Sequence, residues 1–197
     1  MAVRKVGLNL IVAASSVLFG VVMAQAPAPA ETDVSVWKSF SPLEAGFTIL
    51  MPAEPSEATD DIDTKLGKLK NHKFSTRTGL AYYLVAYSDF PEVITDPATI
   101  KRMLDSGRER ALTVSGAQLK NEADIKLGDH IGREWSVEVP GSYIATARAY
   151  WVRKRLYQTI IVMDAQANIT PEAARVRQGV TAKFLGSFSL TEASKSH

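Results

Sequence analysis

Residues 142–163 read SYIATARAYWVRKRLYQTIIVM, two apolar segments joined by the basic run Arg153-Lys154-Arg155. In the second segment both alternating sets of side chains are apolar: Leu156, Ile160 and Val162 on one face, and Tyr157, Ile161 and Met163 on the other. A strand with two apolar faces has to be covered on both sides. We therefore expect strands at residues 142–152 and 156–163, paired as a hairpin inside a sheet that is covered on each face.

Strand signals also fill the first half of the chain. Alternating or apolar segments bounded by turn residues predict strands at residues 47–51, 57–64, 69–76 and 80–88. The first of these lies within GFTILMPAEP, residues 46–55. We expect it to end at Met51, because Pro52 cannot donate a ladder hydrogen bond and Pro55 keeps the exit extended. The proline pair thus predicts a strand exit, and the lip of a pocket is the other interpretation.

Two later segments, residues 117–127 and 131–139, alternate apolar and polar side chains and are also predicted as strands. The strand at residues 117–127 is expected to expose its polar face to solvent, and its other face is formed by Leu119, Ala123, Ile125 and Leu127. In the second, Trp135 shares the parity of Ile131, Val137 and Val139. That parity predicts an indole pointing into the core.

Two helices are predicted from their caps. Asp96 before Pro97 is a helix start, and the apolar residues that follow at helical spacing point to an end near Ser115-Gly116. Thr170 and Pro171 open a second helix, with an apolar stripe at Val176, Val180 and Phe184. One strand face with small side chains would let a helix approach closely: Ala145, Ala147 and Ala149. These elements predict an α+β class, an antiparallel β-sheet sandwiched between helices in an α/β/α arrangement.

The N-terminal residues have the pattern of a secretory signal peptide. Arg4 and Lys5 precede an apolar run, and Val22 and Ala24 give small side chains at cleavage-site spacing. We expect cleavage after Ala24, with an uncleaved membrane anchor as the alternative. The predicted organisation is a signal peptide at 1–24, a flexible linker at 25–34, a single domain at 35–190 and a tail at 191–197. The expected location is periplasmic or secreted.

Composition excludes several classes of function. Removing residues 1–24 takes away Arg4 and Lys5 and no acidic residue, so the 23 basic and 21 acidic side chains become 21 of each. A formally neutral chain offers no electrostatic basis for binding nucleic acid or an anionic bilayer. We also expect no stable membrane insertion once the signal is cleaved. The sequence has no cysteine, which excludes disulfides, thiolate metal sites and thiol catalysis.

The order of several motifs resembles bacterial exported proteins of the PsbP-like type. The motifs are residues 37–40, Gly46-Phe47 through Met51-Pro52 and Pro55, AYYLVAYSDFP at 81–91, the helix from Pro97, GREW at 132–135, AYWVRKRLY at 149–157 and FLGSFSL at 184–190. They cover nearly the whole predicted domain and consist of turns and strand ends. The resemblance implies an antiparallel sheet between helices and an accessory or binding role, and it assigns no role to any residue.

No motif in the sequence predicts chemistry. Asp60, Asp61 and Asp63 are the densest acidic cluster, but they lack the ligand spacing of an EF-hand loop and fit the charged edge of a sheet. His72, His130 and His197 have no zinc-ligand spacing, and no nucleophile elbow or phosphate-binding loop occurs. We therefore predict no enzyme activity, no catalytic, cofactor-binding or metal-binding residues, and no cofactor.

The sequence favours a non-catalytic accessory or protein-interaction domain. The candidate residues for contact with an envelope protein partner lie in and beside the basic run: Tyr150, Trp151, Arg153, Lys154 and Arg155. Aromatic and arginine side chains together are common at interface hot spots, although a merely solvated hairpin tip is the simpler interpretation. The alternatives are a small-ligand-binding protein with an apolar pocket between helix and sheet, in which Tyr82, Tyr83 and Tyr87 are candidate lining residues, and a hydrolase. The sequence leaves the oligomeric state open.

Overall fold

The computed structural model describes residues 37–64, 67–165 and 169–191. The predicted signal peptide and linker lie outside the described residues, so those expectations remain predictions. The strands are β1 (Lys38–Phe40), β2 (Phe47–Met51), β3 (Ser56–Thr64), β4 (Gly67–Arg77), β5 (Tyr82–Asp89), β6 (Gln118–Leu127), β7 (His130–Val139), β8 (Tyr143–Val152), β9 (Arg155–Asp164) and β10 (Ser189–Leu190). The helices are α1 (Pro97–Ser115) and α2 (Pro171–Gly186).

Seven strands form one antiparallel sheet in the order β3-β4-β5-β9-β8-β7-β6. The hairpin of β8 and β9 lies in its interior, as the two apolar faces of residues 156–163 predict, and the acidic strand β3 lies at one edge. A second, three-stranded sheet has the order β1-β2-β10. The antiparallel α+β class is therefore confirmed, and so is the exit of β2 after Met51.

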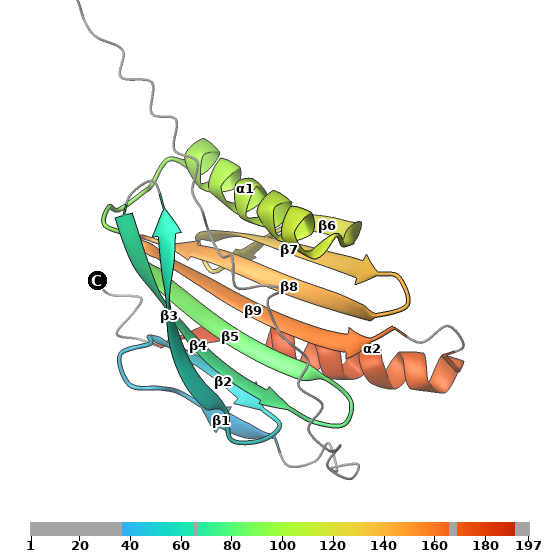
Figure 1. Cartoon of the computed structure of the whole chain (residues 1–197). Helices are drawn as coiled ribbons and strands as arrows, with labels where there is room; N and C mark the ends of the chain where they lie inside the picture. The colour runs from blue at the N-terminus through green and yellow to red at the C-terminus, as the bar shows by residue number, and fades with distance from the viewer. Residues whose placement is uncertain (1–36, 65–66, 166–168, 192–197) are drawn as a thin grey trace, which may run out of the picture.

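Different elements cover the two faces of the large sheet. Figure 1 shows α1 on one side and α2 with β1 and β2 on the other. The core is correspondingly divided into two clusters, one under α1 around Trp135, Trp151 and Ile160, and one under α2 around Tyr157, Ile161 and Phe184. The expected cover of helices was thus incomplete, because the small sheet shares the second face with α2.

The helix ends follow the predicted caps. The Asp96 side chain accepts a hydrogen bond from the Thr99 backbone N–H at 2.8 Å, and Gly116 ends α1 with a φ of 64°. Thr170 caps α2 in the same way through the Ala173 N–H. The predicted α2 stripe is shorter than expected, since Val176 is 47% exposed. Among the described residues, neither helix has the length and apolar character that a membrane crossing requires.

Strand β6 departs from the predicted alternation. A bulge between Leu119 and Asn121 shifts its register against β7, so Leu119 lies opposite Val137 on the α1 face, while Ile125 and Leu127 pack against the cluster on the α2 face. The prediction that all these apolar side chains share one face was wrong for Leu119. The polar face is not entirely solvent-exposed either, because Glu122 forms an ion pair with Arg108 of α1.

Candidate functional site

Three connections meet at one end of the central strands. They are the β1–β2 loop, the segment between β5 and α1, and the turn of the β8–β9 hairpin, and we call residues 41–46, 90–95 and 152–155 the loop end. The Phe90 N–H donates a hydrogen bond to the Lys154 carbonyl oxygen at 2.7 Å, and the Ile94 N–H donates to the Arg153 carbonyl oxygen at 3.1 Å. The hairpin turn is therefore fixed to its neighbouring segment through the backbone.

Arg155 joins the strands to the β1–β2 loop. Its guanidinium binds both carboxylate oxygens of Asp89, with Nε to Oδ1 at 2.7 Å and Nη2 to Oδ2 at 2.6 Å. Its Nη1 also donates to the carbonyl oxygens of Glu44, at 3.0 Å, and Ala45, at 2.9 Å. Burial opposes the charged form, but hydrogen bonds with Asp89 and Tyr157 outweigh it and raise the pKa of Arg155 above its ordinary value.

The structure therefore changes the role predicted for Arg155. Its side chain is only 22% exposed and connects β5 to the β1–β2 loop within the fold. It is therefore not available to bind a partner. Arg153 and Lys154 are exposed, and neither side chain has a partner among the described residues. The basic run thus contributes two available cations instead of three.

Tyr150 and Trp151 also have different roles from the predicted ones. Tyr150 is 4% exposed and stacks on Phe188 with ring centroids 5.7 Å apart, on the α2 face. Trp151 is 2% exposed on the α1 face, where its Nε1–H donates to the Arg153 carbonyl oxygen at 2.7 Å. Adjacent residues of a strand point to opposite faces, so both aromatic rings are enclosed by the covers of the sheet. Neither ring is available to a partner in this structure.

We expect Arg155→Ala to lower the free energy of unfolding by about 2 kcal/mol, because it removes hydrogen bonds to a carboxylate and to two loop carbonyls. Lys154→Ala, next in the chain, is the matched control and should change it by less than about 0.5 kcal/mol. Chemical denaturation of both variants measures the difference. Equal, small changes would show that Arg155 is as dispensable as its exposed neighbour.

Backbone strain is concentrated at the loop end. Among the described residues, two non-glycine residues have positive φ angles, Glu44 at 68° and Arg153 at 60°. Such a conformation costs roughly 1 to 2 kcal/mol for a residue with a Cβ atom. Arg155 holds the Glu44 carbonyl, while Trp151 and Ile94 hold that of Arg153. Strained residues that are fixed by their surroundings are frequent at functional sites, so these two positions favour the loop end as the candidate functional site.

Exposed apolar side chains lie in the two segments that bind the β8–β9 hairpin. Leu43 is 92% exposed and Val93 is 53% exposed, each in one of the loops that join the hairpin turn. The acidic residues Glu44 and Glu92 are exposed next to them, so the surface carries both signs of charge. A surface groove of about 320 Å³ lies here and is lined by Asp89, Val93, Val152, Arg153, Lys154, Arg155 and Tyr157.

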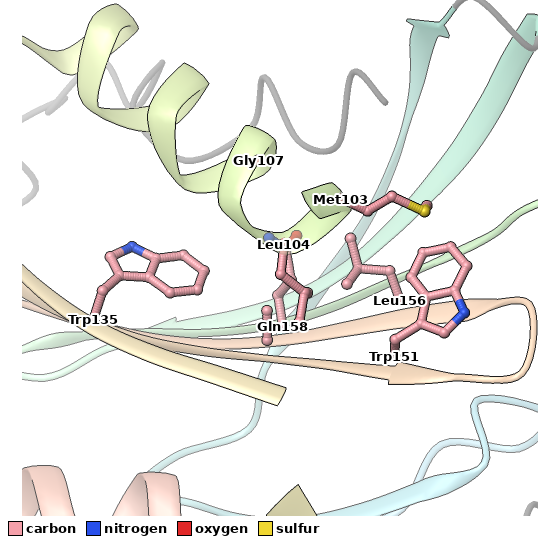
Figure 2. Close-up of a pocket in the computed structure, with 8 residues that line it drawn as sticks. Met103, Leu104, Gly107, Trp135, Trp151, Leu156 and Gln158 are labelled. Carbon is pink, nitrogen blue, oxygen red and sulfur yellow. The ribbon is translucent and has the colours of Figure 1, made fainter. Parts of the chain in front are cut away.

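The interface between α1 and the sheet is filled. Figure 2 shows Trp135 and Trp151 rising from the sheet on either side of Leu104 and Gln158, with α1 above them. The space left among these residues is about 10 Å³, roughly room for one water molecule. Tyr83 and Tyr87 are buried on the other face of the sheet. Beside α2 an open groove of about 230 Å³ is lined by Ile144, Thr146, Ile161, Met163, Arg177, Gln178 and Thr181.

The hydroxyl group of Thr59 lies close to the imidazole of His72, on the outer hairpin of β3 and β4. The Thr59 Oγ1 lies 3.2 Å from the Nδ1 of His72, whose ring stacks on Tyr87 at 4.7 Å. A nucleophile and its base need a third group that orients the imidazole. Among the described residues no side chain binds the other ring nitrogen of His72.

The acidic cluster of β3 is used in cross-strand ion pairs. Lys70 binds Asp61 at 2.7 Å and thereby lowers the pKa of that carboxyl group, and Lys73 binds Asp60. Asp60 and Asp61 are consecutive strand residues and point to opposite faces. Within the described ranges, no group of three or more histidine, aspartate or glutamate side chains is arranged to hold a metal ion.

Comparisons with known proteins address the fold. No protein-family model matches the chain, and no curated protein matches it. Among solved structures, the chain is similar to the "Solution Structure of Cyanobacterial PsbP (CyanoP) from Synechocystis sp. PCC 6803", with a TM-score of 0.48 and 14% sequence identity, over 84% of this chain and 98% of that chain. A likeness of this extent assigns no activity, partner or role to this chain.

Proposed function

We propose that this protein is an exported, non-catalytic accessory domain that docks on a protein of the cell envelope through its loop end. The observation that carries the proposal is the rigid display of Arg153 and Lys154. Their turn is held by the Trp151 indole and by two backbone N–H groups, so little conformational freedom is lost when a partner binds. Val93 lines the same groove as these cations and supplies apolar contact area, and Leu43 is exposed in the β1–β2 loop that Arg155 binds.

The non-catalytic part of the proposal is supported by how the polar groups are used. The carboxylates of β3 are paired with lysines, and the hydroxyl and imidazole of Thr59 and His72 stand on the exposed outer hairpin. The space under α1, one of the two places where the small-ligand alternative could have its pocket, is occupied by side chains, and the groove beside α2 is open to the surface. The sheet, covered by α1 on one face and by α2 with the small sheet on the other, serves as a scaffold for the loops.

The docking proposal is tested by capture from the native envelope. Arg153→Ser with Lys154→Ser should reduce recovery of the partner at low salt, and the difference from the unmodified chain should shrink as salt is raised. Lys38→Ser with Arg175→Ser removes the same two charges elsewhere on the exposed surface and is the control. The free energy of unfolding of both double variants should lie within about 0.5 kcal/mol of that of the unmodified chain. Equal capture by all three proteins, at every salt concentration, would overturn the proposal.

Export has its own test. The exported chain is expected to begin at Gln25, because Val22 and Ala24 give the small-side-chain spacing of a cleavage site without a proline at the cut. Intact mass spectrometry of the protein recovered from the envelope fraction measures this start directly. A mass that still includes the apolar run at residues 6–23 would show that the chain is kept as an anchored protein.

A further inference from the structure

The two edges of the large sheet differ in their charges. Strand β3, at one edge, contains Glu57, Asp60, Asp61 and Asp63 and no basic residue. Two copies of β3 paired side by side would bring two acidic strands together, and β3 itself offers no cation to the other copy, since Lys70 and Lys73 belong to β4 and already bind Asp61 and Asp60. Charged side chains on an edge strand are one way in which natural sheets protect an edge. Strand β6, at the other edge, contains both signs of charge.

We propose that β6 pairs antiparallel with β6 of a second copy of this chain, in a register centred on Ile125. In this register Ile125 faces its own counterpart across the two-fold axis. Asp124 of each copy then lies opposite Lys126 of the other, and Ala123 lies opposite Leu127. The inference goes beyond the proposed function, since it concerns a different edge of the molecule and would hold whether or not the loop end docks.

The apolar side chains of β6 favour this register. Ile125 and Leu127 pack against the core cluster on the α2 face, so that cluster reaches the last strand of the sheet and ends there half-covered. A second copy placed in this register continues the apolar stripe with its own Leu127, Ile125 and Ala123. Cross-strand pairs of this kind each contribute roughly 0.2 to 1 kcal/mol.

The charged side chains lead to the same register. Lys126 is exposed and has no partner among the described residues, whereas Asp124 is fixed by Lys101 at 2.7 Å and Arg133 at 2.9 Å. Shifting the centre to Asp124 would place the two Asp124 carboxylates face to face, and shifting it to Ala123 would place Glu122 opposite Asp124. The centre at Ile125 puts a cation opposite an anion at both symmetric positions.

The β6 bulge does not interfere with this pairing. It lies between Leu119 and Asn121, and residues 122–127 keep a regular register against β7. A two-fold axis at an antiparallel edge is perpendicular to the sheet, so the α1 face of one copy continues as the α1 face of the other. The partner thus meets a regular stretch of strand with unpaired backbone groups on its outer side, and β6 has no other neighbour than β7 among the described strands.

A single introduced cysteine tests the register, because the chain has none of its own. Directly opposite residues in an antiparallel pair have Cα atoms roughly 4.5 to 5.5 Å apart, which suits a disulfide. The exported chain with Ile125→Cys should therefore form a disulfide-linked dimer under mild oxidation. Ala123→Cys should not link to itself, but should link to Leu127→Cys when the two proteins are mixed. Equal linkage by Ile125→Cys and Ala123→Cys, or none in either experiment, would overturn the proposal.

A charge exchange tests the same interface in solution without oxidation. Sedimentation equilibrium should show the unmodified chain associating to twice its mass, with Lys126→Glu weakening the association by about tenfold or more, because acid then faces acid at both symmetric positions. Asp124→Lys should weaken it likewise. A mixture of the two variants restores opposite charges at every position and should associate as well as the unmodified chain. An unmodified chain that stays monomeric, or a mixture that associates no better than the separate variants, would contradict the pairing.

Discussion

Trp135→Ala is expected to lower the free energy of unfolding by about 3 to 5 kcal/mol, the range for truncation of a large buried aromatic side chain. Trp135 is 3% exposed and is part of the cluster that α1 covers. It lies opposite Ala147 on the neighbouring strand, whose small side chain has no means of filling the space left by an indole. The variant therefore loses both the burial of the ring and the packing of α1 around it.

Urea denaturation followed by circular dichroism measures this loss. Ser136→Ala is the matched control, because Ser136 is the next residue of the same strand and points to the other face, where its hydroxyl accepts a long hydrogen bond from the Asn121 side chain at 3.3 Å. The control should change stability by less than about 1 kcal/mol. A Trp135→Ala midpoint equal to that of the control would place the indole outside the core.

Gly132→Ala is expected to cost about 3 kcal/mol, because the added methyl group overlaps its neighbours. A Cβ atom built at Gly132 lies 2.5 Å from the Tyr150 Cδ1 and 2.8 Å from the Ala149 carbonyl oxygen. The Tyr150 ring cannot easily move aside, since it stacks on Phe188. Glycine at this position therefore creates the space in which the tyrosine lies over β7.

The same substitution elsewhere in the chain provides the control. Gly179 lies in α2, and an added Cβ meets no atom within 4 Å. Gly179→Ala should stabilise the protein by roughly 0.5 to 1 kcal/mol, because alanine has the higher helix propensity. Thermal melts of the two variants should therefore shift in opposite directions. Shifts of the same sign would show that the contact between Gly132 and Tyr150 is not a constraint on the fold.

Features that depend on near neighbours in the sequence were predictable. Both helix starts follow from an acceptor side chain before a proline, at Asp96 and Thr170. The parity of the side chains in residues 156–163 correctly sorted them into two opposite faces of the sheet, and the structure places α1 over one set and α2 over the other. Alternation works there because an interior strand without a bulge keeps its period of two along its whole length.

Features that depend on distant neighbours were not predictable. The role of Arg155 depends on Asp89 and on two carbonyl groups of the β1–β2 loop, residues that are far away in the sequence. The β6 bulge likewise arises in the pairing with β7, and no local signal marks Leu119 as the point where the faces exchange. Local patterns predict the face of the strand or helix to which a side chain points, but not the residues that it contacts in the folded chain.

The candidate site shows the same division. The sequence indicates the basic run as a contact candidate, yet the aromatic residues beside it lie in the core, and no local pattern marks the exposed Leu43 and Val93 as part of the site. Leu43 directly follows Pro42, and Val93 lies two residues after Pro91, each in a connecting segment. That composition signals a loop without indicating which other loops will lie nearby.

Site-specific photocrosslinking in the native envelope tests whether this domain docks through the loop end. A photoreactive amino acid at position 154 should give a discrete adduct, because that side chain is exposed on the fixed hairpin turn. The same group at position 175, exposed on α2, is the comparison and should give none. Adducts of equal yield and identity from both positions, or adducts from position 175 alone, would contradict docking through the loop end.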